Sequence, residues 1–80
     1  MGNEYGSIVL SFKDVMDEIG ISRNKLSKLA GIRYEVADRL YNGTIKRLDL
    51  DVLARVCYEL ECSIDEVIEY KPVRMRSIWR

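Results

Sequence analysis

Apolar side chains near the start of the chain recur three and four positions apart, at Phe12, Val15, Met16 and Ile19. That spacing places them on one face of an α-helix. Ser11 precedes the run and Gly20 follows it, and these residue types are favoured caps at the two ends of a helix. The pattern therefore predicts an amphipathic helix that buries this face.

Four further segments show the same helical spacing, each between a capping residue and a break. The helices are expected over 22–30, 33–41, 49–60, and from 63 to a point before Pro72. The side chains expected to face the core are Leu26, Leu29, Ala30, Val36, Ala37, Leu40, Leu50, Leu53, Ala54, Val56, Cys57, Leu60, Ile64, Val67 and Ile68. Five short helices with short connections are typical of a compact all-α bundle.

Two segments near the chain ends have a different pattern. Residues 7–10 form a short apolar run that fits either an entering strand or the first turn of a helix. After Pro72, which ends a helix, residues 73–78 alternate with period two, as a strand does. Such a strand could pair with residues 7–10 of the same chain or of a partner chain.

The length of 80 residues fits one small domain with a modest core. We expect this domain at residues 8–70, after a flexible N-terminal segment at 1–7. Residues 71–80 form a basic and apolar tail.

A tight turn at Gly31 separates the second expected helix from the third. Two short helices joined in this way form a helix-turn-helix. A small turn lets the helices cross steeply, so that the second can enter a DNA major groove while the first lies across the backbone.

Four segments carry the pattern of a known family: GISRNKLSKLAGI at 20–32, RLYNG at 39–43, LDVLARVC at 50–57 and LECSIDEVI at 60–68. With them the chain resembles the Cro/C1-type (XRE family) helix-turn-helix regulators, in particular the minimal single-domain members, over about residues 8–70. The resemblance implies a compact five-helix, lambda-repressor-like fold. It also implies a sequence-specific transcriptional regulator of double-stranded DNA, expected to be a repressor that binds pseudo-palindromic operators as a homodimer. The compartment is expected to be the cytoplasm, since the sequence shows neither a membrane span nor a signal peptide.

The chain departs from the family pattern at several positions. Arg23 stands where the family usually has Gln, Ser27 where it usually has Ala, and Arg33 where Ser or Thr often caps the third helix. The third helix also carries two acids, Glu35 and Asp38. Acids repel phosphate, so these two either accept hydrogen bonds from bases or mark a domain that binds DNA weakly. The alternative function is a protein-interaction module on the same fold, such as an antitoxin-like or antirepressor-like partner.

The expected DNA contacts follow from the outward side of the third helix and from the basic residues around it. By analogy with the family, Tyr34, Glu35 and Asp38 are expected to face bases, and Arg39 is expected to contact a base or a phosphate. Arg39 could instead pair with Glu35, four residues earlier. The residues expected to contact phosphates are Arg23, Arg33, Asn42, Lys46 and Arg47.

The net charge of zero hides a strong segregation of charge. Residues 23–47 carry seven basic and two acidic side chains, a net charge of +5, whereas residues 48–70 carry one basic and seven acidic side chains, a net charge of −6. Because steering of a polyanion depends on the local field, the middle of the chain is the candidate anion-binding surface.

Apolar residues are frequent near the C-terminus. They include Ile68, Tyr70, Val73, Met75, Ile78 and Trp79. We interpret these six as a homodimer interface that places two recognition helices in successive turns of the groove. The alternative is that they complete the core of a single chain.

Other classes of function find no support in the residues. The chain has no histidine and two cysteines, Cys57 and Cys62, too few soft ligands for a four-ligand zinc site. It has neither a glycine-rich phosphate loop nor a nucleophile with an evident base, so we expect no enzyme, cofactor or small-molecule ligand. No apolar run is long enough for a membrane span, and the start does not resemble a signal peptide.

Overall fold

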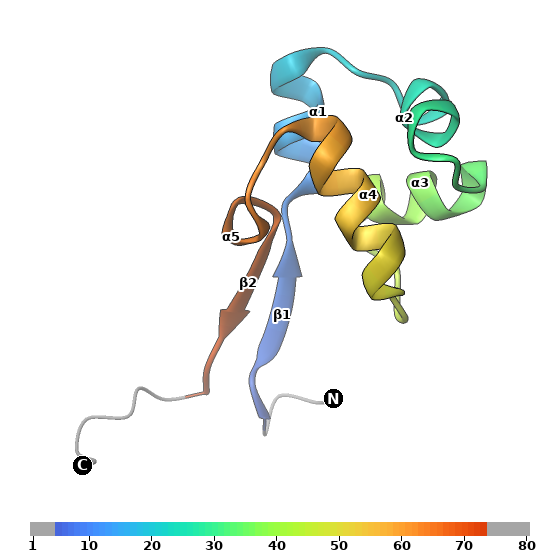
Figure 1. Cartoon of the computed structure of the whole chain (residues 1–80). Coiled ribbons are helices and arrows are strands. Elements are labelled where there is room, and N and C mark those ends of the chain that lie inside the picture. Colours follow the sequence, from blue (N-terminus) through green and yellow to red (C-terminus); the bar gives the residue numbers. More distant parts are fainter. Residues whose placement is uncertain (1–4, 74–80) are drawn as a thin grey trace.

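A computed structural model describes residues 5–73 of the chain. The elements in chain order are β1 (Ser7–Leu10), α1 (Phe12–Ile19), α2 (Arg23–Ala30), α3 (Tyr34–Asn42), α4 (Leu50–Leu60), α5 (Ile64–Val67) and β2 (Ile68–Lys71). Figure 1 shows α1 to α4 gathered into one body, from which the two strands project as a ribbon. The expected fold of five helices with a short strand pairing is confirmed.

The core combines fully buried side chains from every helix. The largest of them are Phe12, Met16, Leu26, Leu40, Val56 and Val67. Ala37 on α3 is also fully buried. These residues lie on the helix faces that the periodicity predicts, because a 3.6-residue repeat brings each of them to the same side of its helix.

Several side chains expected in the core are exposed instead. Leu50 is 78% exposed and Ile64 is 54% exposed, since each is the first residue of its helix and lies beyond the packed face. Leu29 is 46% exposed because the buried face of α2 is formed by Leu26, Ser27 and Ala30. The remaining exposed exceptions are Ile19 and Ala54.

The helix ends show which capping predictions hold. The Ser22 hydroxyl accepts the backbone N–H of Lys25 at 3.0 Å, as an N-cap does. Asp49 likewise accepts the backbone N–H of Asp51 at 2.8 Å. Ser11 precedes α1, but its side chain caps nothing; its backbone N–H donates to the carbonyl oxygen of Val67 at 2.8 Å and so joins the start of α1 to α5.

The strands pair within one chain. β1 and β2 are antiparallel, with Ile8 opposite Tyr70 and Leu10 opposite Ile68. The strand interpretation of residues 7–10 is therefore confirmed, but their partner in the structure is Ile68–Lys71, before Pro72, and not the segment 73–78. Of that segment only Val73 lies among the described residues.

The boundary between α5 and β2 corrects another expectation. We expected Ile68 to continue the buried face of the fifth helix, whereas the structure begins a strand there. Ile68 has φ −134° and ψ 130°, which are strand values. From Ile68 to Lys71 apolar and charged residues alternate, and this local alternation prevails over the short helical pattern.

Candidate nucleic-acid interface

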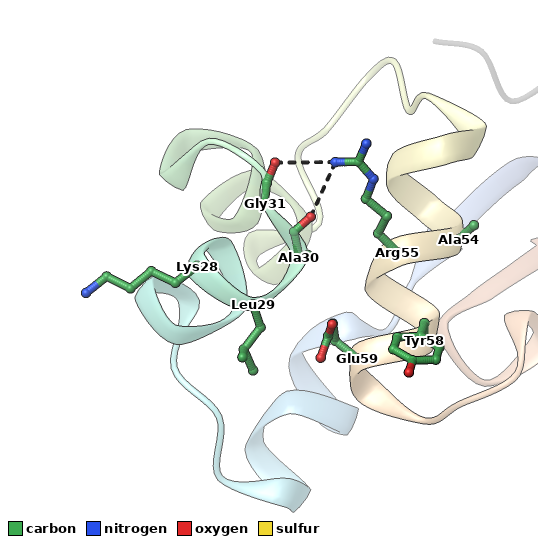
Figure 2. Close-up of a pocket in the computed structure, with 8 residues that line it drawn as sticks. All are labelled: Lys28, Leu29, Ala30, Gly31, Ala54, Arg55, Tyr58 and Glu59. Carbon is green, nitrogen blue, oxygen red and sulfur yellow. Dashed lines mark hydrogen bonds between the residues drawn. The ribbon is translucent and has the colours of Figure 1, made fainter.

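The turn between α2 and α3 is held by Gly31 and by a side chain from α4. Gly31 has φ +68°, a left-handed conformation that glycine adopts without the steric cost of a Cβ atom. Arg55 reaches from α4 to this turn, where its Nη1 atom lies 3.5 Å from the carbonyl oxygens of Ala30 and Gly31 (Figure 2). Its Nη2 atom pairs with Asp51 at 2.9 Å. Arg55 thus connects α4 to the turn that sets the direction of α3.

The outer surface of α3 carries a stripe of polar side chains. Glu35, Asp38, Arg39 and Asn42 lie at the i, i+3, i+4 and i+7 positions of one helix face. Ala37 and Leu40 are buried on the opposite side. Tyr34 stands half-exposed at the start of the helix. The buried pattern of α3 therefore leaves all four base-facing candidates at least partly accessible.

Basic side chains gather beside the second half of α3. Arg39, Lys46 and Arg47 line one open hollow of about 380 Å³ between α3 and the loop that leads to α4. All three are exposed. Three residues that the sequence assigns to DNA contacts are thus brought together, because the loop after Gly43 returns along the helix.

Two other candidate residues, Arg23 and Asp38, form an ion pair with each other. The Nη1 atom of Arg23, at the start of α2, lies 2.7 Å from Oδ1 of Asp38 on α3. The guanidinium carbon of Arg23 also lies 4.9 Å from the centre of the Tyr41 ring, within range of a cation–π interaction. A cation at a helix N-terminus is unfavourable by itself, and the Asp38 carboxylate compensates for it here. The sequence predicts a phosphate contact for Arg23 and a base contact for Asp38, but it does not predict this pair.

The same network continues into α1. The Tyr41 hydroxyl donates to Oδ1 of Asp17 at 2.9 Å, and Nζ of Lys13 pairs with Oδ2 at 2.9 Å. The hydrogen bond from Lys13, followed by the one from Tyr41, lowers the pKa of the Asp17 carboxyl below its ordinary value. The bond and the charge of Asp17 raise the pKa of Lys13. These contacts join α1 to the last turns of α3.

Sequence reasoning missed Lys13, Asp17, Tyr41 and Arg55 as supports of α3. The spacing of Lys13 and Asp17, four residues apart, is the one local signal among them. Tyr41 and Arg55 contact residues 24 or 25 positions away, and no local pattern indicates such contacts. The alternative in which Arg39 pairs with Glu35 has no counterpart among the ion pairs within residues 5–73.

The remaining candidate residues differ in exposure, and three of them lie outside the described residues. Arg33 is exposed at the N-cap of α3, where its side chain makes no capping bond, and Asn42 is exposed at the other end. Of the dimer candidates, Ile68 is half-buried against the core, whereas Tyr70 and Val73 are exposed. Met75, Ile78 and Trp79 lie outside the described residues. Within residues 5–73, the helices are too short or too polar to cross a membrane.

Comparison with known proteins agrees with this geometry. The crystal structure of the transcriptional regulator VanUg has the same fold, with a TM-score of 0.64, 20% sequence identity, and coverage of 90% of this chain and 97% of that one. No curated protein shows significant sequence similarity to this chain. Residues 11–73 match the family described as the Cro/C1-type HTH DNA-binding domain. Because this match extends over most of the 80 residues, the chain belongs to the Cro/C1-type helix-turn-helix DNA-binding domain family.

Proposed function

We propose that this protein is a transcriptional regulator that binds a specific double-stranded DNA sequence, and that it acts as a repressor on pseudo-palindromic operators. The observation that carries the proposal is the cluster of Arg39, Lys46 and Arg47 around one hollow beside the exposed face of α3. Lys46 and Arg47 suit a phosphate backbone that flanks a groove, and Arg39, on α3 itself, would reach a base within that groove. The family description and the similarity to a regulator support the same function.

The residues of α3 receive different roles in this proposal. Arg39 would donate to the acceptor edge of a guanine, Glu35 would accept from a cytosine amino group, and the Tyr34 ring would pack against a thymine methyl group. The phosphate contacts would come from Arg33, Asn42, Lys46 and Arg47. Phosphate contacts fix the register of a protein on DNA, whereas base contacts supply the sequence preference.

The alternative of a protein-interaction module loses part of its support. It rested on the zero net charge and on two acids on the recognition helix, and the charge of one of these acids, Asp38, is compensated by Arg23 at 2.7 Å. Glu35 remains as the acid on that face without an ion pair among the described residues.

The ribbon supports the proposed homodimer. Opposite residues of an antiparallel pair share a face, so Ile8, Leu10, Ile68 and Tyr70 form one apolar face of the ribbon. Leu10 and Ile68 pack on the core of the chain, while Ile8 is 59% and Tyr70 is 56% exposed. A two-stranded ribbon is only marginally stable in water unless another element packs against its apolar face. A second copy of the chain would cover the exposed part of this face, which is formed by Ile8 and Tyr70.

The dimer is tested by sedimentation of the full chain. Ile8→Glu places a charge on the apolar face and is expected to shift the protein to monomer, whereas Ser7→Glu, on the opposite face, is the matched control. Equal association of both variants and the unchanged protein would place the interface elsewhere.

DNA binding is tested by fluorescence polarisation with a pool of labelled random duplexes. Affinity should fall steeply as salt rises, because binding releases counterions from the phosphates. On a duplex selected from this pool by the unchanged protein, Arg39→Ala should weaken binding by at least about tenfold. Lys28→Ala, an equal change of charge on an exposed residue outside the hollow, should have a much smaller effect. A folded protein that binds no duplex at low salt contradicts the proposal.

A further inference from the structure

We infer that Arg23 positions Asp38 for base recognition, so that the two act as one specificity-determining pair. The inference rests on the proposed function. Arg23 holds Oδ1 of Asp38 and leaves Oδ2 to accept a hydrogen bond from an exocyclic amino group in the major groove, that of cytosine in the first place.

The first support is the restraint on Arg23. Its guanidinium contacts Asp38 at 2.7 Å and stacks over the Tyr41 ring at 4.9 Å. The ring is itself held, because the Tyr41 hydroxyl donates to Asp17 at 2.9 Å. An arginine restrained on two sides has little freedom to follow a phosphate, and it can act as a fixed support for its carboxylate partner.

The second support is the position of Asp38. It lies at the edge of the polar stripe of α3, the face that the proposal directs toward the bases. Its side chain is 35% exposed, which leaves part of the carboxylate accessible while Arg23 covers the rest. The pair thus presents the accessible part of the Asp38 carboxylate to a DNA base as a hydrogen-bond acceptor.

The third support is electrostatic. A bare carboxylate on a DNA-facing helix would be repelled by the phosphates. The guanidinium of Arg23 cancels that charge locally, so an acid can take part in recognition without this loss of affinity. Arg23 therefore contributes to binding through Asp38 as well as through its own charge.

The effects of substituting Arg23 and Asp38 on DNA affinity should not be additive. Arg23→Ala should weaken binding of the preferred duplex about tenfold and relax the preference at one base pair. Asp38→Ala should relax the preference at the same base pair. The double variant should bind more tightly than Arg23→Ala alone, because the carboxylate that lost its partner is gone. Arg23→Lys, which keeps the charge, should recover part of both affinity and preference.

The experiment measures a double-mutant cycle on the duplex selected by the unchanged protein and on its single-base variants. Circular dichroism establishes that each variant is folded; should Arg23→Ala not fold, Arg23→Gln takes its place. Additive losses, together with an unchanged base preference in Arg23→Ala, would overturn the inference and leave Arg23 as a phosphate contact. If the unchanged protein binds no duplex, the proposed DNA-binding function fails together with the inference. If it binds a preferred duplex but the losses are additive, the inference alone fails.

Discussion

The hydroxyl of Tyr41 donates a 2.9 Å hydrogen bond to Oδ1 of Asp17, and this bond ties the last turns of the recognition helix to α1. Two cations lie near the centre of the Tyr41 ring, Nζ of Lys13 at 5.5 Å and the guanidinium carbon of Arg23 at 4.9 Å. The orientation of α3 is therefore supported by polar contacts at its edge as well as by the core beneath it. Lys13, Asp17 and Tyr41, which make these contacts, lie outside the polar stripe of Glu35, Asp38, Arg39 and Asn42 on α3.

The Asp17 contacts predict a dependence of stability on pH. Lys13 and Tyr41 hold the pKa of Asp17 below its ordinary value of 3.8. A lowered pKa in the folded state means that Asp17 stabilises the fold above its unfolded pKa and loses this effect as the pH falls through the lower, folded pKa. Thermal unfolding of the unchanged protein and of Asp17→Asn should therefore differ near neutral pH, and the difference should shrink as the pH falls below the ordinary pKa of 3.8. A difference that stays constant or grows toward acid would contradict this role.

The contrast between Leu40 and Leu50 tests the position of the core. Leu40 on α3 is 1% exposed, whereas Leu50 at the start of α4 is 78% exposed. Leu40→Ala should lower the free energy of unfolding by about 2–5 kcal/mol, since it leaves a cavity. Leu50→Ala makes the same chemical change at the surface and should cost less than about 0.5 kcal/mol. Chemical denaturation measures both, and similar losses would show that α4 is packed differently.

The cysteines provide a local probe of burial. Burial, with a smaller effect of Cys57 nearby, raises the pKa of the Cys62 thiol to about 11. Because the thiolate is the reactive form, alkylation of Cys62 should be slow at neutral pH. In a Cys57→Ser variant, burial together with the charge of Glu66 should keep the pKa of Cys62 above the ordinary 9.0. The alkylation rate against pH gives this value, with the urea-unfolded chain as control; half-titration at or below pH 9.0 would show that the thiol is not shielded.

Periodicity predicts the parts of the fold that depend on neighbouring residues. Phe12 and Met16 on α1 and Leu40 on α3 are buried as predicted, because each lies near the centre of a helical stripe. Leu50 and Ile64 are exposed because a stripe does not show where packing ends. The start of β2 at Ile68 was missed, since an isoleucine there fits a short helical stripe as well as a strand.

The site shows a similar limit. The cluster of Arg39, Lys46 and Arg47 could be anticipated, since these residues lie close together in sequence around one turn. The pairing of Arg23 with Asp38 spans 15 positions and that of Tyr41 with Asp17 spans 24, and both depend on how the helices pack. Asp38 on α3 has an ion-pair partner, Arg23, that only the packed structure reveals.

The central claim is that α3 recognises a specific, two-fold symmetric DNA sequence. Selection of bound duplexes from a random pool by this 80-residue chain tests it most directly. We expect enrichment of an inverted repeat whose half-sites are separated by about one helical turn of DNA, since each protomer would place one α3 in the groove. Recovery of duplexes without a shared sequence, from a protein that is folded, would contradict it.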